Sequence, residues 1–157
     1  MTTAGTPLVA IVIGSTSDEE AMAGCGQALE RFGIPFEQHV MSAHRTPDRV
    51  ADFMRTAKER GFEVIVAGAG GAAALPGVCA AYTSLPVLGV PLASSPLGGV
   101  DALHSIVMMP PGVPVACMSV GAWGARNAAV FAAEILALRH PAIADALDRY
   151  REEQRNR

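Results

Sequence analysis

Short aliphatic runs alternate with helical patterns along the chain, and this alternation constrains the fold more than any other feature. The run Leu8–Ile13 is rich in Val and Ile, as expected for a parallel strand buried on both faces. An alternation of strands and helices predicts an α/β fold, with one parallel sheet between two layers of helices. We expect further strands at 36–41, 63–67, 86–90 and 113–119, and helices at 18–32, 47–60, about 78–83, 99–106, 124–138 and 142–155.

Five strands in such a chain fit a three-layer αβα architecture with a flavodoxin-like strand order. The strand 36–41 is more polar than the others, so we place it near an edge of the sheet. The chain has 157 residues and neither a repeat nor a linker, so we expect one domain, 1–157. Residues 1–6 are expected to form a loose tail. The last helix, 142–155, is a candidate for packing on a neighbouring subunit.

The low charge content indicates a partner. Only 17% of the residues are charged and half are apolar, whereas an average domain has about 25% charged residues. We therefore expect a homo-oligomer that buries much of the surface against other copies. The net charge of −3 argues against nucleic acid as a partner. No uncharged apolar run of about 18 residues is present, so we expect no membrane span and, from the first residues, no secretion signal.

The cysteines and histidines give no sign of a metal centre. Cys25, Cys79 and Cys117 are widely spaced and odd in number, which fits neither a disulfide framework nor a metal motif. No pair of histidines has metal-ligand spacing. We therefore expect no metal, and small buried thiols in a reducing cytoplasm.

Ligands in open α/β sheets bind beyond the carboxyl ends of the strands, so the loops after the first three strands are the place to search for a site. The second of them, Ser42–Pro47, carries the most chemistry. Thr46 and Pro47 suit the N-cap and first position of a helix, whose N-terminus attracts phosphate. Arg45 adds a fork of donors for phosphate oxygens, and His44 exchanges protons near neutral pH. The alternative for His44 is a helix-start residue bonded to nearby backbone.

The first loop, 14–18, joins a strand to a helix with three hydroxyls and a carboxylate. One interpretation is helix capping by Ser17 or Asp18. Capping does not account for all four polar side chains. The other interpretation is that hydroxyls such as Ser15 bind phosphate oxygens while Asp18 accepts hydrogen bonds from ribose hydroxyls.

The third loop, Gly68–Ala73, fits the dinucleotide-binding pattern G-x-G-x-x-A after a strand. The acidic residue expected about 20 residues later is missing, because Leu88–Val90 occupies that region. A phosphate-binding P-loop motif is missing as well. We interpret the loop as bare backbone, in which Gly70 and Gly71 let a flat ring approach closely.

With the three loops in view, the chain resembles the PurE family, the 5-(carboxyamino)imidazole ribonucleotide mutases of purine biosynthesis. The resemblance is to the bacterial mutase branch more than to the animal carboxylase branch, and it spans Val9 to about Leu138. It rests on six motifs in order: Gly14–Asp18, Ser42–Pro47, Gly68–Ala73, Leu88–Pro91, Gly112–Val115 and Gly124–Ala129.

The resemblance implies an octamer with sites shared between subunits. It implies a reaction without metal or cofactor, in which a carboxyl group moves from the exocyclic nitrogen of an aminoimidazole ribonucleotide to the adjacent ring carbon. It also implies a role for each residue of the loops: Ser15, Asp18 and Arg45 bind the phosphate and ribose, Ser17 and Ser42 assist them, and His44 shuttles the proton.

One position departs from the family pattern. The family usually has a histidine where this chain has Ala74, and a methyl group neither donates, accepts nor titrates. The loop 94–98 is also less typical. Two alternatives therefore stay open: a carboxylase that adds free carbon dioxide to the unmodified ribonucleotide, and a paralogue that binds the nucleotide without turning it over. A flavodoxin-like or response-regulator module is a third, but the chain lacks the acidic cluster and the flavin phosphate signature.

Overall fold

The computed structural model describes residues 5–156 and shows one five-stranded parallel sheet in the order β2-β1-β3-β4-β5. This confirms the predicted α/β class and the flavodoxin-like order. The tail expected at 1–6 lies mostly outside the described residues. The strands are β1 (Val9–Ile13), β2 (Phe36–Val40), β3 (Val64–Gly70), β4 (Val87–Leu92) and β5 (Ala116–Cys117).

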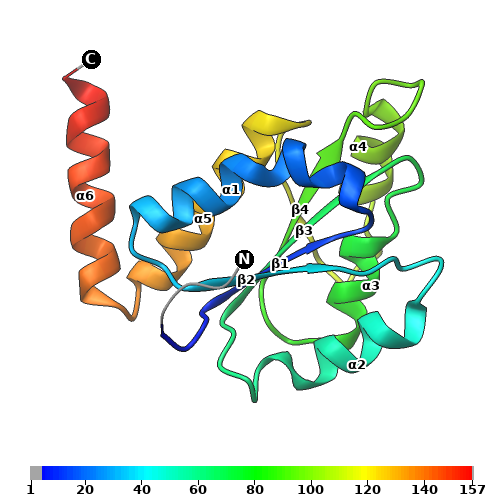
Figure 1. Ribbon diagram of the computed structural model, residues 1–157, viewed down its shortest axis with the longest axis horizontal. Coiled ribbons are helices and arrows are strands. Elements are labelled where there is room, and N and C mark those ends of the chain that lie inside the picture. Colours follow the sequence, from blue (N-terminus) through cyan, green and yellow to red (C-terminus); the bar gives the residue numbers. More distant parts are fainter. Residues whose placement is uncertain (1–4, 157) are drawn as a thin grey trace.

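Helices cover both faces of the sheet (Figure 1). The helices α1 and α5 pack on one face, and α2, α3 and α4 on the other. Their bounds are α1 (Glu19–Arg31), α2 (Pro47–Ala57), α3 (Leu75–Tyr82), α4 (Val100–Val107), α5 (Ala122–Ala137) and α6 (Pro141–Arg155), with a short 3₁₀ turn at Thr16–Asp18 before α1.

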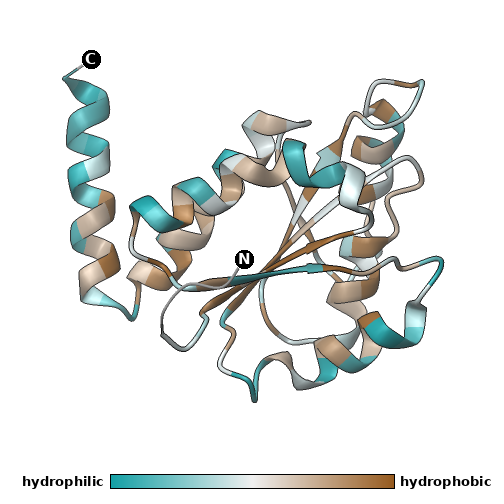
Figure 2. Ribbon diagram, viewed as in Figure 1, coloured by the Kyte–Doolittle hydropathy of each residue, from teal (hydrophilic) through white to brown (hydrophobic). Residues whose placement is uncertain are grey.

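The middle of the sheet is the most apolar part of the molecule (Figure 2). Every residue of β1 is buried, because β1 lies between β2 and β3 and both its faces are covered by helices. By contrast, four of the five residues of β2 are partly exposed. This pattern confirms the edge position that its polar sequence predicted.

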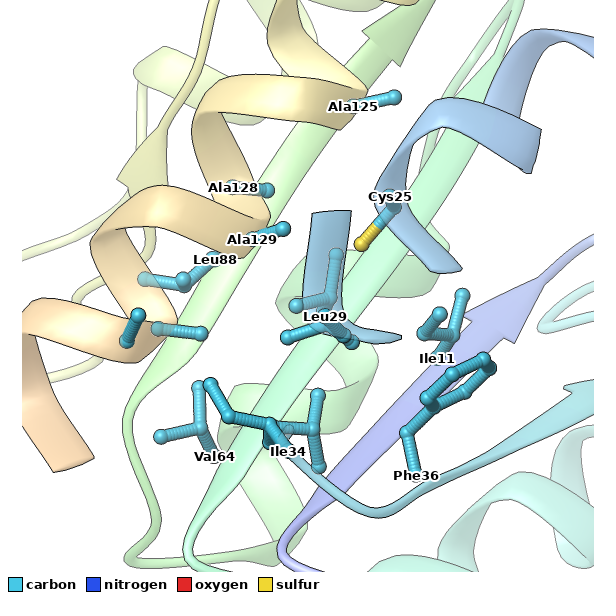
Figure 3. Close-up of a cluster of buried hydrophobic side chains, with 14 of the residues drawn as sticks. Ile11, Cys25, Leu29, Ile34, Phe36, Val64, Leu88, Ala125, Ala128 and Ala129 are labelled. Atoms are coloured by element: carbon cyan, nitrogen blue, oxygen red, sulfur yellow. The ribbon is translucent and has the colours of Figure 1, made fainter. Parts of the chain in front are cut away.

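The core on the α1 and α5 face is built from large side chains against small ones (Figure 3). Leu29 and Cys25 of α1 project toward the sheet and toward α5, which presents Ala125, Ala128 and Ala129. All five side chains are fully buried. Small residues on α5 bring its backbone close to α1, so the layer is thin and closely packed.

Two strand predictions were wrong at their ends. β3 continues through Gly68 to Gly70, where the glycine-rich sequence predicted a loop. A Cβ at Gly68 would lie 2.8 Å from the Met22 sulfur, so this glycine allows close packing of α1 and does not mark a turn. β5, expected at 113–119, is reduced to Ala116–Cys117. It lies at the sheet edge, and Pro114 lacks the N–H that a longer ladder would need.

The last helix projects from the body (Figure 1). One side of it nevertheless packs on its own chain, where Ile143 is buried and the Tyr150 ring meets the Phe32 ring edge-on at 5.2 Å between centroids. Ion pairs from Arg31 to Glu153 and from Arg151 to Glu134 tie it further to α1 and α5. Within residues 5–156, every helix is too short or too polar to cross a membrane.

Candidate active site

One cleft of about 360 Å³ opens at the carboxyl ends of the strands. It lies at the point where the chain order reverses, with β1 and β3 side by side and their following helices on opposite faces. All three loops singled out in the sequence meet there. The lining consists of Gly14, Ser15, Ser17, Asp18, Ser42, Ala43, His44, Arg45, Ala69, Gly70, Ala73, Ala74, Leu75 and Ser94.

Seven of the eight predicted site residues line this cleft, and Gly71 does not. The lining follows β3 as far as Gly70 and resumes at Ala73. Gly71 has a φ of +61°, so its role in the described chain is to turn the backbone after β3. Two lining residues that the sequence reasoning missed are Leu75 and Ser94.

The loop that carries His44 is held by its own side chains. The Thr46 hydroxyl donates to the Ser42 carbonyl at 3.0 Å and accepts from the Ser42 N–H at 3.1 Å. The Ser42 hydroxyl accepts from the Arg45 N–H at 3.2 Å. Thr46 occupies the N-cap position and Pro47 begins α2, as predicted, but the Thr46 side chain does not cap the helix. It instead closes the loop into a fixed turn.

Arg45 connects two of the loops. Its guanidinium donates to the Gly14 carbonyl at 3.1 Å, across the carboxyl ends of β1 and β2. The rest of the side chain is exposed, with donors left for an anion. His44 is exposed beside it at the mouth of the cleft. The His44 ring and the free donors of Arg45 therefore lie side by side on one turn that hydrogen bonds hold in place.

In the first loop, the residue whose side chain caps the start of the helical segment is neither of the two expected. Ser15 caps the 3₁₀ turn, because its hydroxyl accepts from the Ser17 N–H at 3.3 Å and from the Ser17 hydroxyl at 3.0 Å. Asp18 is the N-cap of α1 but makes no side-chain cap bond. The capping predicted for Ser17 or Asp18 was therefore wrong: a 3₁₀ turn precedes the helix and moves the cap upstream.

Asp18 is the one charged side chain in residues 5–156 that is buried, with 6% of its surface exposed. Burial raises the pKa of this carboxyl, and a hydrogen bond from the Ser15 backbone offsets the rise only in part. A carboxylate held at a cleft wall at a cost in stability is typical of a binding group.

Replacing Asp18 should have opposite effects on the stability of the fold and on the binding of substrate. Since the folded-state pKa is raised, the ionised carboxylate destabilises the fold above that pKa, and the cost disappears well below the ordinary aspartate pKa of about 3.9, where both states are protonated. Asp18→Asn should therefore raise the melting temperature at pH 7 and leave it nearly unchanged at about pH 3. The same variant should lose about 10- to 100-fold in kcat/KM, as expected for a hydrogen bond to a charged group. A lower melting temperature at pH 7 would contradict this account.

The third loop is a strained backbone turn. Ala73 has a φ of +43°, which residues with a side chain rarely adopt. The Ser105 hydroxyl of α4 donates a hydrogen bond to the Ala72 carbonyl and so attaches the loop to this helix. Ala73 and Ala74 then line the cleft with methyl groups. The loop supplies shape and backbone donors and no titratable side chain, as the sequence predicted.

The other nucleophilic groups lie away from the cleft. Burial raises the pKa of the Cys25 and Cys79 thiols to about 12, so neither is a nucleophile near neutral pH. Among the described residues, no three His, Cys, Asp or Glu side chains gather as a metal site. The chemistry of the cleft therefore centres on His44, Asp18 and Arg45.

Comparisons with known proteins identify the family of the chain. A family model described as AIR carboxylase matches residues 8–157. An N5-carboxyaminoimidazole ribonucleotide mutase of Pyrococcus abyssi is 53% identical over 155 residues, covering 99% of this chain and 88% of the relative. The mutase of Pseudomonas aeruginosa is 53% identical over 147 residues, covering 94% and 90%. The crystal structure of Treponema denticola PurE superposes with a TM-score of 0.85 at 29% identity, covering 96% and 92%.

Proposed function

The chain belongs to the AIR carboxylase family, and within it we propose the function of an N5-carboxyaminoimidazole ribonucleotide mutase of purine biosynthesis. The enzyme is an isomerase that moves a carboxyl group from the exocyclic nitrogen to the adjacent ring carbon. The observation that carries this conclusion is the convergence of His44, Arg45 and Asp18 in one cleft, in a chain about half identical to curated mutases.

The substrate's phosphate and ribose bind on the β1 and β2 side of the cleft. Arg45 and the hydroxyls of Ser15, Ser17 and Ser42 provide donors there, and the Asp18 carboxylate accepts from ribose hydroxyls. These contacts are remote from the bonds that change, so they orient the ring for the reaction. Gly70 lines the same cleft, and the Ser94 hydroxyl occupies the space that a side chain at Gly70 would fill.

His44 acts first as an acid and then as a base. The imidazolium protonates the exocyclic nitrogen as the bond from that nitrogen to the carboxyl carbon breaks and carbon dioxide leaves. The ring carbon then attacks the carbon dioxide, and the neutral imidazole removes the proton from that carbon. One proton leaves His44 and one returns, so the enzyme is unchanged. An imidazole ring can give up a proton and take one back, so it suits both steps.

The opposite wall of the cleft is apolar except for Ser94. Ala73, Ala74 and Leu75 line it, and they offer carbon dioxide a surface that does not compete for its electrophilic carbon. Retaining a freed gas requires a closed cavity. In a single chain His44 and Arg45 are exposed, so a cover must come from elsewhere. We propose that a neighbouring copy supplies it, in line with the low charge content.

We expect the purified protein to have eight times the mass of one chain by analytical ultracentrifugation. Several large apolar side chains are exposed in one chain and would be covered in the assembly. The most exposed are Leu97, Met108, Trp123 and Leu138, at 66%, 79%, 81% and 85%. A monomer at micromolar concentration would contradict the proposed assembly.

The proposed setting is the cytoplasm, with a small phosphoribosyl compound as substrate and neither metal nor cofactor required. Three free thiols, two of them buried, favour a reducing compartment.

A comparison of two substrates distinguishes the mutase from a direct carboxylase. The mutase should convert N5-carboxyaminoimidazole ribonucleotide without added bicarbonate. It should be slow on the uncarboxylated ribonucleotide even with bicarbonate present. The reverse preference would identify a carboxylase, and tight binding without turnover would identify the binding paralogue.

A further inference from the structure

The loop after β4 brings an additional hydroxyl into the cleft. Ser94 follows β4 by two residues, and its side chain lies directly over Gly70. A Cβ at Gly70 would lie 1.8 Å from the Ser94 Oγ and 3.2 Å from the Leu92 carbonyl oxygen. Any side chain at position 70 would therefore displace Ser94, so the glycine at the end of β3 keeps this place for the hydroxyl.

Ser94 is unusual for its side of the cleft. The lining that follows β1 and β2 is polar, whereas the lining from β3, α3 and the loop after β4 is apolar except for Ser94. Its hydroxyl has no hydrogen-bond partner among residues 5–156. A free donor therefore lines the same cleft as His44, within the part of the lining that is otherwise apolar.

The neighbouring residue fixes the loop. The Ser95 hydroxyl donates to the Asp101 carboxylate at 2.7 Å and accepts from the Leu97 N–H at 3.2 Å. A backbone bond from Gly98 to the Ser95 carbonyl closes the same turn at 3.0 Å. Asp101 lies in the first turn of α4, so the loop is attached to a helix that packs on the sheet. The bond from Ser95 lowers the pKa of the Asp101 carboxyl, which keeps the acceptor charged.

We propose that Ser94 donates a hydrogen bond to the migrating carboxyl group, and that Asp101, through Ser95, is a positioning residue for this contact. The inference rests on the proposed mutase function. Negative charge on the carboxyl oxygens is lost as carbon dioxide forms and returns when the new bond to carbon forms. A neutral hydroxyl that rotates freely can follow those oxygens from nitrogen to carbon and so hold the carbon dioxide in line with the ring carbon, and the methyl group of Ala74 does not compete with it.

The test is a kinetic comparison of Ser94→Ala, Ser95→Ala, Asp101→Ala and the double variant Ser94→Ala/Asp101→Ala. Ser94→Ala should lower kcat about tenfold or more, with the nucleotide KM within about threefold of wild type, because the phosphate contacts are intact. Ser95→Ala and Asp101→Ala should lower kcat in the same way. The double variant should be no slower than Ser94→Ala alone, because all these changes remove one contact.

Two control variants distinguish the loss of the Ser94 hydroxyl from a general effect of replacing a serine. Ser84→Ala removes an exposed serine before β4, at the other end of the same strand, and should leave kcat unchanged. Ser94→Thr retains the hydroxyl and should recover most of the lost rate. Near-normal kcat in Ser94→Ala would overturn the contact, and additive losses in the double variant would overturn the positioning role of Asp101. An inactive wild type would instead count against the proposed function itself.

Discussion

His44→Asn should lose at least 10²- to 10⁴-fold in turnover, the range expected when a general acid–base group is removed. Asparagine keeps a polar side chain of similar reach but does not titrate, so neither proton transfer has a carrier. Substrate should still bind with nearly unchanged affinity, because Arg45, Asp18 and the loop hydroxyls remain. Formation of the ring-carboxylated product by ultraviolet absorbance, together with calorimetric binding, measures both quantities.

His104→Asn is the matched control for this experiment. His104 is exposed on α4 and does not line the cleft, so its replacement should leave turnover unchanged. If His44→Asn retained near-normal turnover, His44 would have no part in the proton transfers and the mechanism would need another group.

Leu29→Ala should lower the free energy of unfolding by about 2–5 kcal/mol, as expected when a large buried side chain is truncated in a closely packed core. Leu29 is fully buried between the sheet and the alanine-rich face of α5 (Figure 3). Its neighbours on α5 are already small, so they cannot fill the cavity that the truncation leaves. Urea unfolding at fixed protein concentration measures the change, since association also contributes to stability.

Glu30→Ala is the comparison for Leu29→Ala. Glu30 is the next residue of α1 and is exposed, so at a concentration where both variants have the same mass its truncation should cost less than about 0.5 kcal/mol. Equal losses in the two variants would show that the interior of the α1 and α5 layer does not determine stability.

The sequence predicted the fold well where local pattern and tertiary environment agree. β1 is aliphatic throughout and buried throughout, and β2 is polar and lies at the edge. The failures depend on contacts that are distant in sequence. Gly68 continues β3 because it pairs with Ile13 of β1 and Val90 of β4, and no local pattern contains those contacts. β5 is likewise short because only Ala116 and Cys117 pair with β4, and pairing with a neighbouring strand cannot be read from the local sequence.

The site could be predicted because the carboxyl ends of parallel strands face the same edge, so three polar or glycine-rich loops had to meet. The details that were missed arise from loop geometry. Capping moved to Ser15 because a 3₁₀ turn precedes α1. Ser94 was missed because only the loops after the first three strands were searched, although the same rule applies to the loop after β4.

The most direct test supplies purified protein with N5-carboxyaminoimidazole ribonucleotide labelled with ¹³C in its carboxyl group. The assay contains EDTA and unlabelled bicarbonate, and neither ATP nor added metal. We expect the ring-carboxylated product to form and to retain the label, because the carbon dioxide released within the site is recaptured before it escapes. No product, or a product whose carboxyl carbon comes from the unlabelled bicarbonate, would contradict the assignment as a mutase.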